Sequence, residues 1–177
     1  MDKTSNTTSE SVEPDSSQAD VLFSHMQDLM DVLPAMEKRG ECLAKARAAR
    51  EALRLERYRQ GQEHELCHIQ DKFNEQVALE HEAKAAGDDE KEKTARCKVL
   101  NLGNQMSVRR GAEAHARRNL EEALVQSGFS NIDDARTAAL EDGAFSALEE
   151  EIESFKADYA STLAACQNIA EEEGYEE

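Results

Sequence analysis

The run His64-Glu65-Leu66-Cys67-His68 combines residue types and a spacing that are typical of catalysis. It matches the pattern H-E-x-x-H, in which two histidines one helical turn apart bind Zn²⁺ and the glutamate activates a bound water. A peptidase of this class needs a third metal ligand. Its extended motif has glycine and histidine where this chain has Asp71 and Asn74. We therefore predict no enzyme activity and no cofactor. A small helical zinc metallopeptidase, with His64 and His68 as ligands, is the alternative hypothesis.

The composition predicts the kind of element that carries this motif. Charged residues make up 33% of the 177, aromatic residues 5%, and tryptophan is absent. Such a chain has little large apolar surface to bury but favours long helices. We predict an all-α, elongated fold: an antiparallel helical hairpin or coiled coil, a short connecting helix and a C-terminal heptad helix.

Charge blocks predict how the hairpin pairs. Residues 38–60 and 91–118 are rich in lysine and arginine, whereas 61–90 and 119–177 are acidic. A turn at Gly87 would set the acidic 61–86 beside the basic 88–113, which is how antiparallel coiled coils fix their register. Gly87 suits a helix C-cap, and Asp88 or Asp89 suits the next N-cap.

A stripe of apolar residues near the C-terminus predicts a helix that lies along another helix. Its members recur at spacings of three and four, and charged residues fill the other faces. This predicted interaction seam consists of Phe145, Leu148, Ile152, Phe155, Tyr159, Leu163, Cys166 and Ile169.

The remaining boundaries follow from local signals. Pro34 is expected to interrupt or kink a helix, Gly128 to end one, and Ser130 to begin the short helix, which Gly143 closes. The predicted organisation is a disordered tail (1–18), a short amphipathic helix (19–34), a hairpin turning near 86–89 (35–126), a turn and short helix (127–143), and the heptad helix with an acidic tail (144–177).

Residues 120–166 resemble the coiled-coil region of bacterial SbcC, the SMC-like ATPase subunit of the SbcCD nuclease. The matching positions are Gly128, Phe129, Ala135, Leu140, Leu148, Ile152, Phe155 and Tyr159. The resemblance implies a rod segment with a link to DNA repair. It does not extend to the ATPase head, because the chain has no GxxxxGK[ST] loop, nor to the zinc hook, because it has no CxxC.

These observations favour a non-catalytic coiled-coil protein that associates with itself or with another coiled-coil protein. A further hypothesis is a DNA-associated accessory rod that binds nucleic acid directly through Arg109-Arg110 and Arg117-Arg118. The net charge of −17 disfavours such binding. No apolar run long enough for export or a membrane span is present. With four widely spaced cysteines, we predict a cytoplasmic location.

Overall fold

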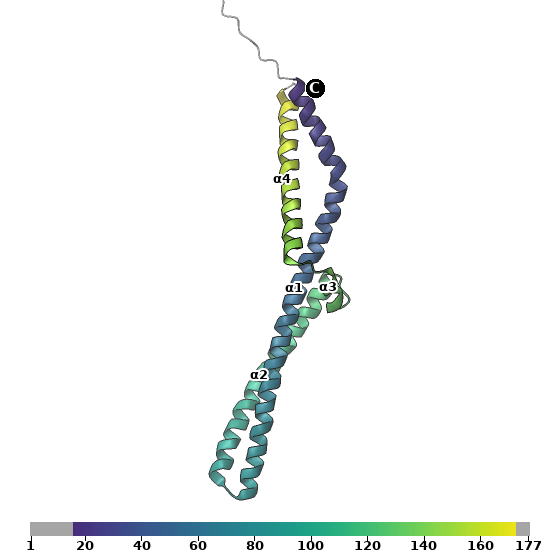
Figure 1. Cartoon of the computed structure of the whole chain (residues 1–177). Helices are drawn as coiled ribbons and strands as arrows, with labels where there is room; N and C mark the ends of the chain where they lie inside the picture. The colour runs from purple at the N-terminus through teal and green to yellow at the C-terminus, as the bar shows by residue number, and fades with distance from the viewer. Residues whose placement is uncertain (1–15, 173–177) are drawn as a thin grey trace, which may run out of the picture. The chain divides into compact units, whose positions relative to one another are not determined.

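The computed structural model describes residues 16–172, which form four α-helices and, within that range, no β-strand. These are α1 (Ser16–Ala86), α2 (Asp89–Gln126), α3 (Ile132–Ala138) and α4 (Asp142–Glu172), shown in Figure 1. The predicted all-α fold with long helices is confirmed. The helices form two compact units: unit 1 comprises 1–42 and 142–177, and unit 2 comprises 43–141. α1 contributes its first part to unit 1 and the rest to unit 2.

Unit 2 is a hairpin of α1 and α2 that turns at two residues. Gly87 has φ +68°, a left-handed conformation that residues with a Cβ rarely adopt. Its amide donates to Lys84 O at 3.2 Å, and the Asp88 amide donates to Ala83 O at 3.0 Å. This pair of bonds is a Schellman cap. The Asp88 carboxylate then accepts from the Lys91 amide at 3.1 Å and begins α2.

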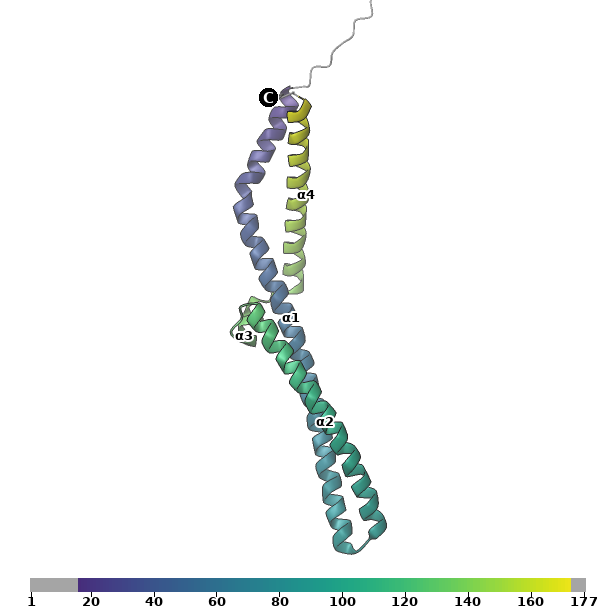
Figure 2. The same ribbon diagram turned by 180° about the vertical axis from the view of Figure 1, so that it is seen from behind.

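The two helices of the hairpin wind around each other in both views (Figures 1 and 2). Ten of the 15 less exposed positions of α2 recur at alternating spacings of three and four, which is a coiled-coil repeat. They are Glu92, Ala95, Val99, Leu102, Met106, Arg109, Glu113, Ala116, Leu120 and Ala123. Each of the other five is adjacent to a position of this repeat. Arg109 Nη1 lies 2.6 Å from Glu65 Oε2, so the acidic stretch of α1 does face the basic stretch of α2.

A second turn closes unit 2 at its other end. Gly128, with φ +71°, and Phe129 repeat the Schellman pattern, because their amides donate to Val125 O and Leu124 O. Phe129 is 6% exposed and packs with Ala49, Ala52 and Ala135. Its burial joins α1, the end of α2 and α3 into the principal apolar cluster of this unit.

Unit 1 is an antiparallel pair made by the first part of α1 and α4 (Figure 1). His25 Nε2 lies 3.1 Å from Asp158 Oδ1, and Arg39 pairs with Glu151. The less exposed residues of this part of α1 follow the same alternating spacing: Leu22, Met26, Leu29, Leu33, Met36 and Gly40. Both units are therefore built from helix pairs with heptad seams.

The predicted interruption at Pro34 is wrong, because α1 continues through it, and the alternative of a kink there stays a prediction. Proline removes one backbone donor and crowds the preceding turn, which normally costs about 3 kcal/mol. Here Pro34 is exposed, while Leu33 and Met36 on either side lie in the seam. A break would separate apolar positions that pack against one helix, α4, so the continuous seam outweighs the local penalty.

The predicted bounds of the short helix are also corrected. Its N-cap is Asn131 rather than Ser130, because Asn131 Oδ1 accepts from the amides of Asp133 and Asp134 at 2.9 and 3.0 Å. α3 ends at Ala138, and Gly143 lies inside α4 instead of closing a helix. Of the expected disordered tail, residues 16–18 belong to α1, while 1–15 and the acidic tail at 173–177 lie outside the described residues.

Candidate functional site

The predicted seam lies on α4 and faces the first part of α1 within the same chain. Phe145, Ile152 and Cys166 are buried, and Leu148, Phe155, Tyr159 and Ile169 are half-buried. The rings of Phe155 and Tyr159 stack in a tilted arrangement with centroids 6.1 Å apart. The first part of α1 thus supplies a helix for this seam inside unit 1.

One position of the observed seam differs from the prediction. Leu163 is 37% exposed, whereas its neighbour Thr162 is 4% exposed and occupies the inward position. With Thr162 the spacing alternates three and four from Phe145 to Ile169 without a break. The Thr162 hydroxyl donates to Asp158 Oδ1 at 3.4 Å, which gives this buried polar group a partner.

The H-E-x-x-H run lies on α1 in unit 2. His64, Cys67 and His68 are exposed, and the Glu65 carboxylate pairs with Arg109 of α2. Between residues 16 and 172 no cluster of three or more His, Cys, Asp or Glu side chains is placed to hold a metal ion. The arrangement gives Glu65 a register-fixing contact across the hairpin.

The basic clusters of α2 are largely engaged within unit 2. Arg109 pairs with Glu65, Arg110 donates to Gln70 Oε1 at 3.4 Å, and Arg117 lies 4.0 Å from Glu121. Contacts of this kind orient exposed arginines along the hairpin, although each exposed pair contributes little stability.

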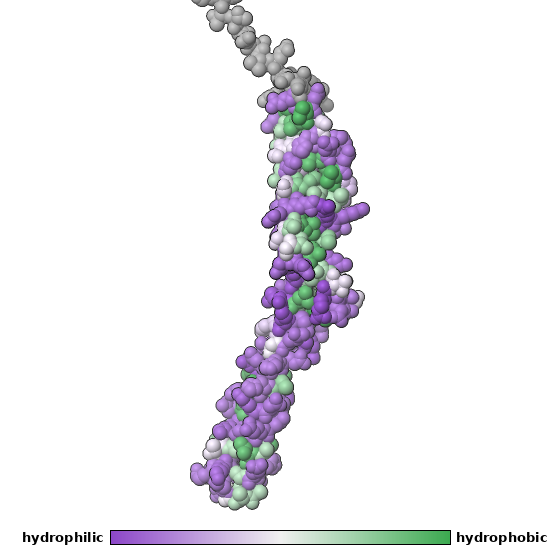
Figure 3. Space-filling model, viewed as in Figure 1, coloured by the Kyte–Doolittle hydropathy of each residue, from purple (hydrophilic) through white to green (hydrophobic). Residues whose placement is uncertain are grey.

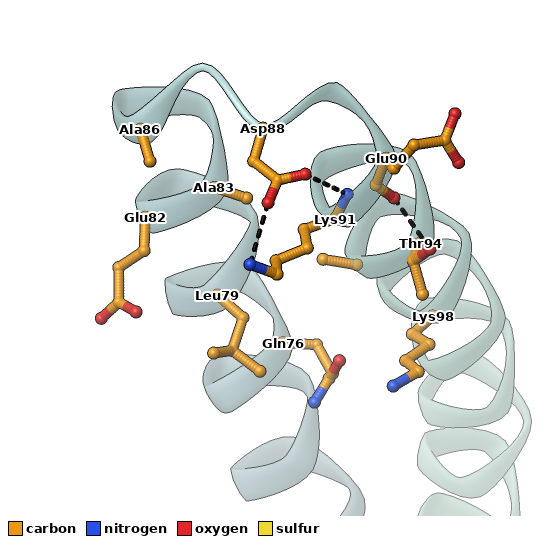
Figure 4. A pocket seen from close by; sticks show the side chains of 11 residues that line it. Gln76, Leu79, Glu82, Ala83, Ala86, Asp88, Glu90, Lys91, Thr94 and Lys98 are labelled. Carbon is orange, nitrogen blue, oxygen red and sulfur yellow. Dashed lines mark hydrogen bonds and ion pairs between the residues drawn. The ribbon is translucent and has the colours of Figure 1, made fainter.

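A groove of about 480 Å³ lies at the tip of the hairpin, where α1 and α2 meet (Figure 4). Alanines and Leu79 line its apolar part because the inward positions here, Ala83 and Ala95, are too small to fill the space between the helices. Asp88 and Lys91, whose charged groups are 2.9 Å apart, stand at its edge. The groove is a consequence of alanine packing and brings no catalytic set together.

A buried charged residue, which the sequence prediction omitted, lies on the inward face of α1. Glu56 is only 8% exposed and accepts two hydrogen bonds from Arg59, at 2.8 and 3.0 Å, and one from Gln60 at 2.6 Å. The bonds from Arg59 hold the pKa of Glu56 below its usual value despite burial, and the bond from Gln60 and the charge of Arg136 act in the same direction. The alternation of Glu and Arg at spacings of three and four is the signal that could have identified this cluster.

No family model, no curated protein and no solved structure matches this chain. The resemblance to SbcC therefore rests on the residues quoted for it. None of the helices described between residues 16 and 172 combines the length and the apolar character that a bilayer crossing requires.

Proposed function

We propose that this protein is a non-catalytic coiled-coil interaction protein, an SbcC/SMC-like rod segment that holds or spaces other components of a DNA-repair assembly in the cytoplasm. The observation that supports this most directly is the heptad spacing of α2, which runs from Glu92 to Ala123 against α1. At 1.5 Å per residue, the 38 residues of α2 extend for about 57 Å. A helix pair of that length suits the spacing of partners.

The character of the buried residues supports the same role. Seven of the 15 buried apolar residues in the described part of the chain are alanines, and no large side chain there is fully buried. Alanine seams let helices approach closely but bury little area, so each pair has modest stability of its own. A further helix that covers such a seam buries more of its apolar area and so stabilises it, which is how a coiled-coil protein binds partners.

The experiment replaces Ile152 and Phe155 together with aspartate in the full chain. Ile152 is 5% exposed, so two carboxylates in this seam should separate α4 from α1 and abolish binding through unit 1. Circular dichroism should show a loss of helix, and sedimentation velocity a changed coefficient. The matched control is aspartate at the exposed Ser154 and Ala157 of the same helix. Unchanged helicity and sedimentation in the Ile152/Phe155 variant would refute the seam assignment.

A further inference from the structure

The charge of the chain is concentrated in one of its two units. Unit 1 has 20 acidic residues and 4 basic ones, whereas unit 2 has 18 and 17. Unit 1 therefore has a net charge of −16 out of −17, and −10 of this belongs to residues 16–42 and 142–172, which form its helix pair. A surface with this imbalance attracts cationic partners and repels anionic ones over roughly a Debye length, about 10 Å at 0.1 M salt.

One flank of this helix pair has two polar contacts between the helices, a hydrogen bond between His25 and Asp158 and an ion pair between Arg39 and Glu151. His25 and Arg39 are 14 residues apart, two heptads, so they share one edge of α1. Their partners on α4, Asp158 and Glu151, are one heptad apart and share one edge there. These polar contacts cover part of the seam from that side, and Val32, midway between His25 and Arg39 on the same edge, is 45% exposed.

The opposite flank has the larger exposed apolar side chains, and it also includes Lys156, one heptad before Leu163. Phe23 lies two residues before His25, about 200° around the helix and therefore across the seam, and Met30 lies one heptad further. They are 48% and 50% exposed. Leu163 of α4 lies five residues after Asp158, which places it across the seam from Asp158 and on the flank of Phe23 and Met30. It is 37% exposed. Apolar residues are visible among hydrophilic ones along the surface of this unit (Figure 3).

The occupant of this flank can be selected by chemistry. Residues 1–15 have only Met1 and Val12 as large aliphatic residues, so this segment lacks an apolar stripe to cover the flank. A second copy would bring another unit 1 with the same excess of acidic residues, which opposes pairing. A basic helix with its own apolar stripe matches both the exposed side chains and the charge around them.

We propose that the flank lined by Phe23, Met30 and Leu163 binds a basic amphipathic helix of a partner protein as a third helix of unit 1. This rests on the proposed function and names the class of partner. Three of the five methionines, Met26, Met30 and Met36, lie in this part of α1, and their unbranched side chains adapt to different apolar stripes. Lysine and arginine beside the stripe of the partner would meet the acidic faces of α1 and α4.

The test measures binding of a fluorescent synthetic peptide to the full chain. The peptide has about 21 residues, or six turns, with leucine at alternating spacings of three and four and lysine at most other positions. Control peptides have the same composition in scrambled order, or glutamate in place of lysine. We expect saturable binding of the first peptide alone, which weakens as salt rises.

Replacing Phe23 and Met30 with serine should weaken binding at least about tenfold, because central apolar contacts dominate the affinity of such interfaces. Both side chains are half exposed, so circular dichroism should not change. The matched control is serine at Val108 and Val125 of unit 2, which are 72% and 78% exposed, and it should bind as the original chain does. Equal binding of the scrambled peptide, or equal loss in the control variant, would overturn the proposal.

Sedimentation velocity separates this proposal from the proposed function. If the peptide does not bind and the chain instead self-associates more strongly as salt rises, with the association lost in the Phe23/Met30 variant, the flank is a self-association surface. That result would overturn the basic partner and leave the coiled-coil function standing. If neither peptide binding nor self-association occurs, and the Ile152/Phe155 variant is also unchanged, both proposals fail.

Discussion

Replacing Phe129 with alanine should unfold the junction of α1, α2 and α3 more readily than any other single truncation in unit 2. Phe129 is 6% exposed, and most of its neighbours are alanines whose short side chains cannot move in to fill the space. Buried Phe→Ala changes cost about 3–5 kcal/mol, and we expect about 3 kcal/mol here because α3 is short and can settle partly into the gap. In addition, Lys45 would lose the ring 5.9 Å from its ammonium group.

Hydrogen exchange and urea unfolding measure this loss. A cost of about 3 kcal/mol corresponds to a decrease of roughly 100-fold in protection of the α3 amides, since 1.4 kcal/mol is a factor of ten. The control is Phe23→Ala in unit 1, where the side chain is 48% exposed and the cost should stay below about 1 kcal/mol. If Phe129→Ala costs less than about 1 kcal/mol and leaves α3 exchange unchanged, the burial of Phe129 does not hold α3 in place.

Three further experiments test other features of unit 2. Gly128→Ala should destabilise by about 1–2 kcal/mol in thermal unfolding, because φ is +71° there, whereas Gly111→Ala, inside α2, should stabilise. Folding lowers the pKa of the Glu56 carboxyl, so this group stabilises the folded state above its unfolded-state pKa and loses that contribution as the pH falls through its folded-state pKa. In Glu56→Gln the melting temperature should therefore depend less on pH in that range. Tag-free protein should bind no stoichiometric zinc in metal analysis, and one tight zinc lost in His68→Ala would contradict the assignment of Glu65 to Arg109.

The turns of this fold could be predicted because single residues determine them. Gly87 and Gly128 both adopt positive φ in Schellman caps, and Asp88, one of the two N-cap residues that the sequence leaves open, caps α2. The pairing of acidic and basic stretches also follows from sequence, since Glu65 meets Arg109 across the hairpin. These features depend on local conformation or on charge blocks many residues long, both of which are visible without a structure.

The misplaced features depend on packing that no single segment encodes. Leu163 is the more apolar of two neighbours, but the phase set by Tyr159 and Cys166 places Thr162 inward. Pro34 is a helix breaker by local propensity, but the seams before and after it face the same helix, α4. In both cases the heptad phase of a whole helix outweighs the preference of one residue.

The heptad phase of α1 and α4 also explains why one flank of unit 1 leaves apolar side chains exposed. In a two-helix pair each seam residue is covered by one partner helix, so the flanking positions must be polar or remain exposed. One flank of unit 1 has His25, Arg39 and their carboxylate partners, and these polar groups cover part of the seam at little cost. The other has Phe23 and Met30, which leave apolar area in water that a third helix would bury at about 25 cal/mol per Å². The difference between the two flanks of one helix pair, more than the acidic charge alone, distinguishes a binding surface from a solvated face.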